Sequence, residues 1–232
     1  MRFLTFLLAI SLAPVAFAAE THAAETQSVR PGINDTYLNP DINAEAQNKG
    51  FTSENRETFA NRMEIAAAIG LKPGMTVADV GAGTGIYEPV FSKAVGASGK
   101  VYAVDISKPL LAFIEKSMKE AGITNVITVL GSDKAINLPP NSVDVVFTSD
   151  VYHHFEYPQA VLSDIRAALK DGGQFIVVDY DNIPGVTAPS RLQHVRTDKK
   201  TVIAEVTQAG FKPPEEVKIS GLKESFFLRF RK

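Results

Sequence analysis

Cysteine is absent from the 232 residues of this chain. Its absence excludes disulfide bonds, thiolate metal ligands and a cysteine nucleophile. The chain also lacks any run of basic residues, and its formal net charge is −2, which argues against a nucleic acid as its partner. Hydrophobic residues make up 45% and charged residues 22% of the chain, as in an ordinary globular protein that is long enough to bury a substantial core.

Long apolar runs are scarce as well, and the most pronounced one lies at the N-terminus. Met1 and Arg2 give a positive start, residues 3–17 are nearly all apolar, and Ala16 and Ala18 are the small residues that a signal peptidase reads. This pattern predicts a secretory signal peptide cleaved after Ala18, which leaves a periplasmic or secreted chain without a stable membrane span. A transmembrane anchor is the alternative, but the apolar run is short for one.

After the signal peptide (residues 1–18) we expect an N-terminal arm over residues 19–54 and one domain over residues 55–232. The arm is polar and contains turn residues, which predicts extended chain over 19–42. Strands are predicted at 76–80, 100–104, 126–130, 143–148, 174–179, 215–219 and 224–230, and helices at 54–69, 87–95, 108–121, 158–170 and 198–209. The alternation predicts an α/β fold, a doubly wound parallel sheet with helices on both faces and an antiparallel strand pair at its edge.

The first of these strands runs into a glycine-rich turn. Asp79 lies near the end of the strand, and glycines follow at positions 81, 83 and 85, where no Cβ stands between the backbone and a bound molecule. A dinucleotide fingerprint needs a glycine at position 86, which is Ile86 here. Asp105 ends the next strand, where an acid can accept hydrogen bonds from both hydroxyls of a ribose. The two features together predict a site for a nucleotide-like molecule other than NAD.

These two segments, VADVGAGTG at 77–85 and VYAVDIS at 101–107, resemble the first two motifs of the class I S-adenosylmethionine-dependent methyltransferases. Residues 130–133, 142–147 and 169–175 resemble the later motifs in the same order, with Asp171 where the family usually has proline. The resemblance covers about residues 55–232 and is nearest to the branch with quinone-precursor and small-molecule methyltransferases. It implies a seven-stranded Rossmann-like sheet, mostly parallel, with an antiparallel last strand.

The resemblance also implies S-adenosylmethionine as the cofactor and a role for each matching residue. The glycines would let the backbone approach the methionine moiety, Asp79 would lie near its amino group, Asp105 would hold the ribose and Ile106 would pack on the adenine. Asp133, with Ser132, would receive the adenine amino group. The expected cofactor-binding residues are Asp79, Gly81, Ala82, Gly83, Thr84, Gly85, Asp105, Ile106, Ser132 and Asp133.

A second group of candidate residues follows the fourth strand, where the methyl group of the cofactor should point. His153 or His154 is a candidate general base or acceptor-positioning group, with Asp150 and Tyr152 beside it. The alternative for either histidine is a packing or capping role. A metal site formed with His194 is disfavoured because adjacent histidines chelate poorly and no thiolate is present, so no metal is expected.

Two weaker hypotheses concern the surroundings of this group. Tyr180 and Asp181 follow the fifth strand and would line an acceptor pocket, or else belong to a polar loop. Tyr37 and Leu38 of the arm would fold over the cleft as a lid.

The sequence thus predicts a methyltransferase that transfers a methyl group by in-line displacement to a small-molecule or envelope acceptor, such as a lipid-like or quinone-like compound. An exported S-adenosylmethionine-binding protein of the same fold without transferase activity is the alternative. A nicotinamide-dependent oxidoreductase is disfavoured by Ile86. The sequence identifies neither the acceptor nor the oligomeric state.

Overall fold

The computed structural model describes residues 25–183, 185, 187 and 189–232. The predicted signal peptide lies outside these residues. Within the described part of the chain, no helix is both long enough and apolar enough to cross a membrane.

Seven strands of the described chain form one sheet in the order β3-β2-β1-β4-β5-β7-β6. Strands β1 to β5 pair in parallel, whereas β7 pairs antiparallel with both β5 and β6. The predicted mostly parallel, Rossmann-like sheet with an antiparallel last strand is therefore confirmed. The strands are β1 (Thr76–Val80), β2 (Lys100–Asp105), β3 (Val126–Leu130), β4 (Val143–Ser149), β5 (Leu169–Tyr180), β6 (Glu215–Glu216) and β7 (Ser225–Arg231).

Short helices precede the sheet, and longer ones connect its strands. The 3-10 turn η1 (Tyr152–His154) directly follows β4. The α-helices are α1 (Asp35–Leu38), α2 (Ala44–Phe51), α3 (Glu57–Ala60), α4 (Arg62–Ile69), α5 (Glu88–Val95), α6 (Lys108–Glu120), α7 (Pro158–Ala168), α8 (Pro189–His194) and α9 (Lys199–Gln208).

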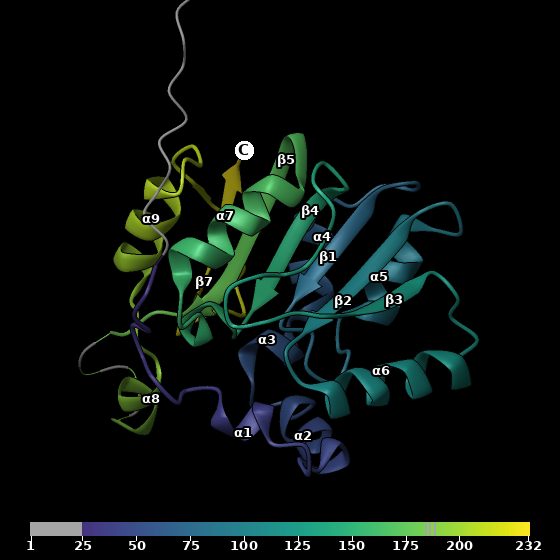
Figure 1. Cartoon of the computed structure of the whole chain (residues 1–232), viewed down its shortest axis with the longest axis horizontal. Helices are drawn as coiled ribbons and strands as arrows, with labels where there is room; N and C mark the ends of the chain where they lie inside the picture. Colours follow the sequence, from purple (N-terminus) through teal and green to yellow (C-terminus); the bar gives the residue numbers. More distant parts are fainter. Residues whose placement is uncertain (1–24, 184, 186, 188) are drawn as a thin grey trace, which may run out of the picture.

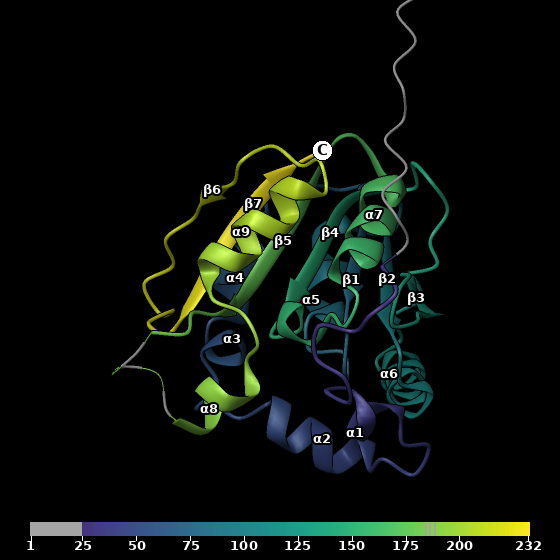
Figure 2. The same cartoon turned by 60° about the vertical axis from the view of Figure 1, so that its left-hand side comes forward.

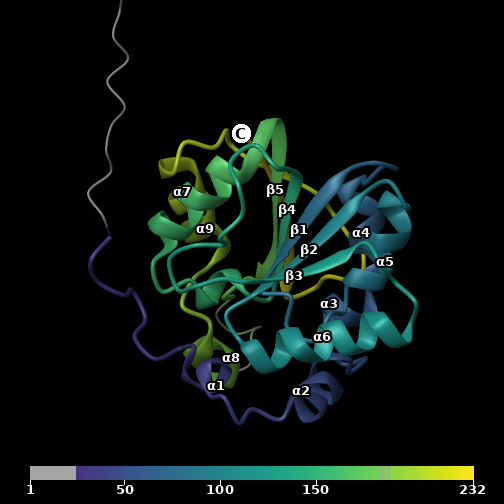
Figure 3. The same ribbon diagram turned by 45° about the vertical axis from the view of Figure 1, so that its right-hand side comes forward.

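Helices cover both faces of the sheet. Successive side chains of a strand point to opposite faces, so one strand packs against helices on both sides. Val101 and Ala103 of β2 pack in the apolar clusters formed with α4, α5 and α6, whereas Val104 packs in the cluster formed with α7 and α9. Figure 3 shows the same division, with α7 and α9 on one side of the sheet and α4 and α5 on the other. The buried core thus fixes the strands rigidly, and their ends can position functional groups.

The carboxyl ends of the parallel strands meet at one edge of the sheet, which is the lower edge in Figure 1. Helices α1, α2, α3 and α8 gather below this edge, as both Figure 1 and Figure 2 show. In open α/β sheets this is the edge at which ligands bind.

Several regions differ from the sequence-based expectation: β5 already begins at Leu169, β6 ends at Glu216, and α8 was not predicted. The helix predicted over 54–69 is divided into α3 and α4 at Asn61, whose side-chain amide donates to the carbonyl of Glu57 (2.8 Å) and thereby caps the first piece. The arm is not extended throughout, because it contains α1 and α2. Helix α2 begins after Asn43, whose side chain accepts a hydrogen bond from the amide of Ala46, the usual interaction of an N-cap residue.

Candidate active site

The glycine-rich turn after β1 has a backbone that favours glycine. Gly81, Gly83 and Gly85 have φ of 77°, 58° and 85°, the left-handed region in which a Cβ is strained. A Cβ on Gly81 would lie 2.3 Å from Cγ1 of Val151, which excludes any side chain at this position. The turn therefore presents bare backbone at the carboxyl end of the central strand.

Asp105, at the end of β2, is hydrogen-bonded to this turn. Its Oδ2 accepts a hydrogen bond from the amide of Gly83 (2.8 Å), and its Oδ1 accepts one from the amide of Ser107 (2.8 Å). Burial raises the pKa of the carboxyl to about 6, although the amides of Ser107 and Gly83 favour the ionised form. Each oxygen has a further lone pair, so the carboxylate can still accept hydrogen bonds from a ligand.

Asp79 forms a second buried acidic group beneath the turn, together with Glu88. Burial, and then the charge of Glu88, raise the pKa of Asp79 well above its ordinary value. Burial also raises the pKa of Glu88, which is fully buried, to about 8. A cation next to Asp79 would favour the ionised form of this pair. Glu88 belongs to none of the sequence motifs described above, so only the fold shows that it is buried.

A single cavity of about 460 Å³ extends from the glycine turn to the residues that follow β4. Eight of the ten residues expected to bind the cofactor line it, namely Asp79, Gly81, Ala82, Gly83, Asp105, Ile106, Ser132 and Asp133. Thr84 and Gly85 do not line it, and their predicted contact with the cofactor stays a prediction. The hydroxyl of Thr84 instead donates to Oδ1 of Asn48 in α2 (3.0 Å), and Gly85 packs against Ile114.

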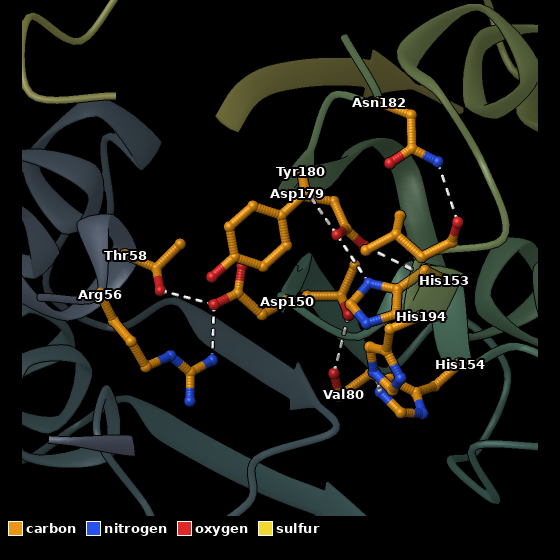
Figure 4. Close-up of polar contacts among 12 residues, drawn as sticks. Arg56, Thr58, Val80, Asp150, His153, His154, Asp179, Tyr180, Asn182 and His194 are labelled. Carbon is orange, nitrogen blue, oxygen red and sulfur yellow. Dashed lines mark hydrogen bonds and ion pairs between the residues drawn. The ribbon is translucent and has the colours of Figure 1, made fainter. Parts of the chain in front are cut away.

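Asp150, directly after β4, lines the other end of the cavity. It has a left-handed backbone (φ 55°), a strained conformation for a residue with a side chain. Its Oδ2 accepts hydrogen bonds from Nη2 of Arg56 (2.6 Å) and from the hydroxyl of Thr58 (2.7 Å), as Figure 4 shows. Its Oδ1 is buried without a hydrogen-bond partner among the described residues. One carboxylate oxygen is thus anchored, and the other has an unused lone pair in a side chain that lines the cavity.

The two adjacent histidines of η1 both line the cavity as well. Nδ1 of His153 lies 2.7 Å from Oδ1 of Asp179, and both side chains are buried. Burial opposes the charge of Asp179, but the imidazole of His153 and two backbone amides outweigh it and lower the pKa of this carboxyl. His154 has a pKa lowered to about 3, mainly by burial and then by the imidazoles of His153 and His194.

Tyr152 does not belong to the site, although the sequence suggested it. Its ring is fully buried in the core beside α7 and α9, its hydroxyl donates to Oε2 of Glu205 (2.8 Å), and it does not line the cavity. The tight turn of η1 directs this side chain to the opposite side from the two histidines that follow it.

The arm and β5 contribute residues that the motifs did not indicate. Asn34, Phe51 and Arg56 line the cavity together with Tyr37, and Leu38 is 56% exposed. Only Tyr37 of the two arm residues considered for a lid therefore faces the cavity. Further residues that line this end are Thr58, Tyr180, Arg191 and His194, whereas Asp181 does not. These positions are far apart in sequence, so no local pattern joins them.

Comparisons with known proteins agree with this geometry. The family model for the methyltransferase domain matches residues 78–177. A crystal structure of an S-adenosylmethionine-dependent methyltransferase from Aquifex aeolicus superposes with a TM-score of 0.72 and 26% identity, covering 82% of this chain and 99% of that one. The chain thus contains a methyltransferase domain and has the fold of S-adenosylmethionine-dependent methyltransferases.

Two curated proteins are similar to this chain over part of their length. Both are named ubiquinone/menaquinone biosynthesis C-methyltransferase UbiE. The one from Cupriavidus taiwanensis is 27% identical over 122 residues, which are 53% of this chain and 50% of the relative. The one from Burkholderia cenocepacia is 29% identical over 117 residues, 50% of this chain and 48% of the relative. The chain thus spans about half the length of the curated relatives that it matches.

The residues of the cavity fit S-adenosylmethionine, the cofactor of the family. The backbone of Gly81 and Gly83 lines the cavity and can lie directly against the methionine moiety. The carboxyl of Asp79 also lines the cavity, and a neighbouring cation favours its ionised form. Asp105 retains lone pairs for the ribose hydroxyls. The cavity volume of about 460 Å³ lies within the range of small-molecule sites.

Proposed function

We propose that this chain transfers the methyl group of S-adenosylmethionine to a small-molecule acceptor that binds between Asp150 and the η1 histidines. The observation that supports it most is the single cavity, which joins the glycine turn and Asp105 to Asp150, His153 and His154. Because the donor and acceptor sites share one cavity, the acceptor atom can approach the methyl group in line with the bond that breaks, as methyl transfer needs.

When bound, S-adenosylmethionine supplies an electrophilic methyl carbon on a sulfonium. An oxygen, nitrogen or carbon atom of the acceptor forms the new bond to this carbon, the carbon–sulfur bond breaks, and its electron pair stays on sulfur. The chain holds the two molecules in line and excludes water from the cavity. Much of the acceleration comes from this positioning.

Asp150 has the geometry of the residue that orients the acceptor. Arg56 and Thr58 bind Oδ2 and fix the carboxylate, whereas Oδ1 has no hydrogen-bond partner among the described residues. In the proposed reaction this oxygen accepts the hydrogen bond of the attacking group and then its proton. The histidines of η1 line the same end of the cavity and surround the acceptor with imidazole rings.

For the acceptor we propose a planar, ring-containing small molecule of the quinone-like class. The rings of Tyr37, Phe51 and Tyr180 line the cavity beside those of the histidines, and aromatic rings favour stacked or edge-on contact with a planar ligand. The names of the two curated relatives, which refer to ubiquinone and menaquinone biosynthesis, support the same class.

We further propose that the chain acts outside the cytosol, because residues 1–18 have the pattern of a cleaved signal peptide. Fractionation of cells that express the full chain tests this proposal. We expect a product that begins at Ala19 in the periplasm or medium, and an uncleaved cytosolic product would contradict it.

The transfer itself is tested with methyl-labelled S-adenosylmethionine and an envelope extract. We expect label in an extractable small molecule with the natural chain, and a loss of at least about tenfold with Asp150→Asn, which keeps the size but removes the carboxylate. Calorimetry with the demethylated product should show unchanged cofactor binding in this variant. Cofactor binding by the natural chain without any label transfer would overturn the activity and favour a binding protein.

A further inference from the structure

Three imidazole rings meet at the acceptor end of the cavity. His153 and His154 come from η1 and His194 from the end of α8. One ring nitrogen from each residue lies within 4.8 Å of the other two, and the ring centroids are 4.4–5.2 Å apart. Figure 4 shows the three rings clustered, with His153 between Asp179 and the other two.

The adjacency of His153 and His154 does not prevent convergence, contrary to the sequence-based expectation. The 3-10 turn brings both rings to the same side of the backbone, with centroids 4.4 Å apart. Nε2 of His154 lies 3.3 Å from Nε2 of His194. Two nitrogens bound to one tetrahedral zinc ion at 2.0–2.1 Å are separated by roughly 3.4 Å, so this pair already has the required spacing.

Each η1 histidine is held by a residue that binds both its ring and its backbone. Asp179 accepts hydrogen bonds from Nδ1 and from the backbone amide of His153 (2.7 and 3.1 Å). Asn34 accepts one from Nδ1 of His154 (3.2 Å), and its amide nitrogen donates to the backbone carbonyl of the same histidine (3.0 Å). These contacts leave Nε2 of each ring to face the cluster.

This arrangement is the one that metal-binding histidines have. A ligating imidazole donates its other ring N–H to a carboxylate or carbonyl oxygen, which fixes its tautomer and orientation. Here Asp179 and Asn34 provide that oxygen. A purely structural pair of histidines needs no third imidazole, and His194 comes from another part of the chain.

The charges around the cluster allow a cation to bind. The carboxyl group of Asp179 lies directly behind His153. Two arginines lie near, of which Arg191 is paired with Glu224 and Arg30 donates to the carbonyl of Gln193.

We propose that His153, His154 and His194 bind one zinc-type divalent transition-metal ion through three imidazole nitrogens, with Asp179 and Asn34 orienting the first two. The ring of one histidine must turn slightly towards the others to close the 4.8 Å span. Three nitrogen ligands without a carboxylate favour Zn²⁺, Co²⁺, Ni²⁺ or Cu²⁺ over Mg²⁺ or Ca²⁺.

The fourth position of such an ion faces the cavity, since all three histidines line it. A site with three protein ligands and one open position is typical of zinc that binds a small molecule rather than of structural zinc. The ion therefore takes an oxygen or nitrogen donor of the acceptor. This assignment rests on the proposed function, but binding of the metal itself does not.

The test uses the tag-free chain after its metal has been removed with a chelator, titrated with Zn²⁺ and separately with Mg²⁺ by calorimetry. We expect one Zn²⁺ per chain, no measurable Mg²⁺ binding, and the visible bands of four-coordinate Co²⁺ after cobalt substitution. His194→Ala should weaken Zn²⁺ at least about tenfold, and Asp179→Asn about 10–100-fold. His22→Ala, which changes the remaining histidine of the sequence, is the matched control and should bind Zn²⁺ like the natural chain.

Binding of S-adenosylmethionine, measured on the same samples, shows that each variant is folded. Absence of stoichiometric Zn²⁺ binding, or equal binding by the natural chain and folded His194→Ala, would overturn the metal site. Failure of methyl transfer while Zn²⁺ still binds would instead overturn the proposed function alone, so the two failures are distinguishable.

Discussion

Asp105 accepts a hydrogen bond from the backbone amide of Gly83 at 2.8 Å. The carboxylate at the end of β2 thereby fixes the glycine turn that follows β1, at the position where two neighbouring parallel strands end. The side chain expected to hold the ribose also shapes the turn that receives the methionine moiety. Cofactor affinity and loop geometry therefore depend on one residue.

Asp105→Asn should weaken S-adenosylmethionine about 10–100-fold, because the amide replaces one of the two acceptor oxygens and removes the charge. Isothermal titration of the variant against the natural chain measures this change. Asp171→Ala, an exposed acid near the start of β5, is the matched control and should leave the dissociation constant unchanged. Equal affinities for all three proteins would contradict the assigned role.

Gly81→Ala should destabilise the fold strongly, since the new Cβ would lie 2.3 Å from Cγ1 of Val151. We expect a loss of about 2–4 kcal/mol, from the overlap and the left-handed backbone together. Gly70→Ala has a similarly positive φ of 78° with nothing within 4 Å and should cost only about 1–2 kcal/mol. Urea unfolding compares the two, and the double variant Gly81→Ala, Val151→Ala should recover part of the difference.

The raised pKa of Glu88 predicts a pH dependence of stability. Between the ordinary pKa of 4.5 and the folded value of about 8, the folded chain holds a proton that the unfolded chain has lost. The free energy of unfolding of the ligand-free protein should therefore fall as the pH rises through about 8. Glu88→Gln cannot release this proton and should flatten the dependence. Thermal unfolding of both proteins from about pH 6 to about pH 9 measures the slopes, and parallel slopes would refute the buried titration.

Arg56 and Asp150 should be energetically coupled, because their ion pair at 2.6 Å joins the start of α3 to the turn after β4. Removing Arg56 alone leaves a carboxylate that is almost fully buried with one partner fewer. We expect a coupling energy of about 1–3 kcal/mol in a double-mutant cycle of the two alanine variants, measured by urea unfolding. Strict additivity of the two single effects would show that the pair contributes nothing.

Tyr152→Phe should separate a structural role from a catalytic one. Loss of the hydrogen bond to Glu205 (2.8 Å) should lower stability by about 1 kcal/mol, with kcat unchanged because the ring does not line the cavity. A large loss of kcat at unchanged stability would show that Tyr152 takes part in the reaction.

Much of the sheet could be predicted from the sequence, because each strand is a short run of β-branched residues. Glycines mark the turns beside these runs, so no information from distant residues is needed. Helix α2 was missed since its sequence AEAQNKGF is largely polar and contains a glycine, and its main signal is the cap residue Asn43. The donor end of the cavity was predictable from two contiguous motifs. Only the cavity as a whole showed that Thr84 faces α2 instead.

The acceptor end was only partly predictable, because its contacts join distant parts of the chain. Asp150 binds Arg56, which is 94 positions away in the sequence, and His154 meets Asn34 120 positions away. The periodic spacing of apolar residues along the sequence does not indicate such long-range pairs. The convergence of His153 and His154 depends on a single 3-10 turn, whose side-chain directions the sequence alone does not fix.

The arm and α8 have a consequence for the evolution of specificity. The matched methyltransferase domain spans residues 78–177, whereas Tyr37, Phe51, Arg56 and His194 line the acceptor end from outside this range. In the proposed reaction the matched domain provides the donor site together with Asp150 and the η1 histidines, and the flanking segments complete the acceptor end. New acceptors can therefore be acquired by exchanging peripheral chain while the inherited donor site stays intact.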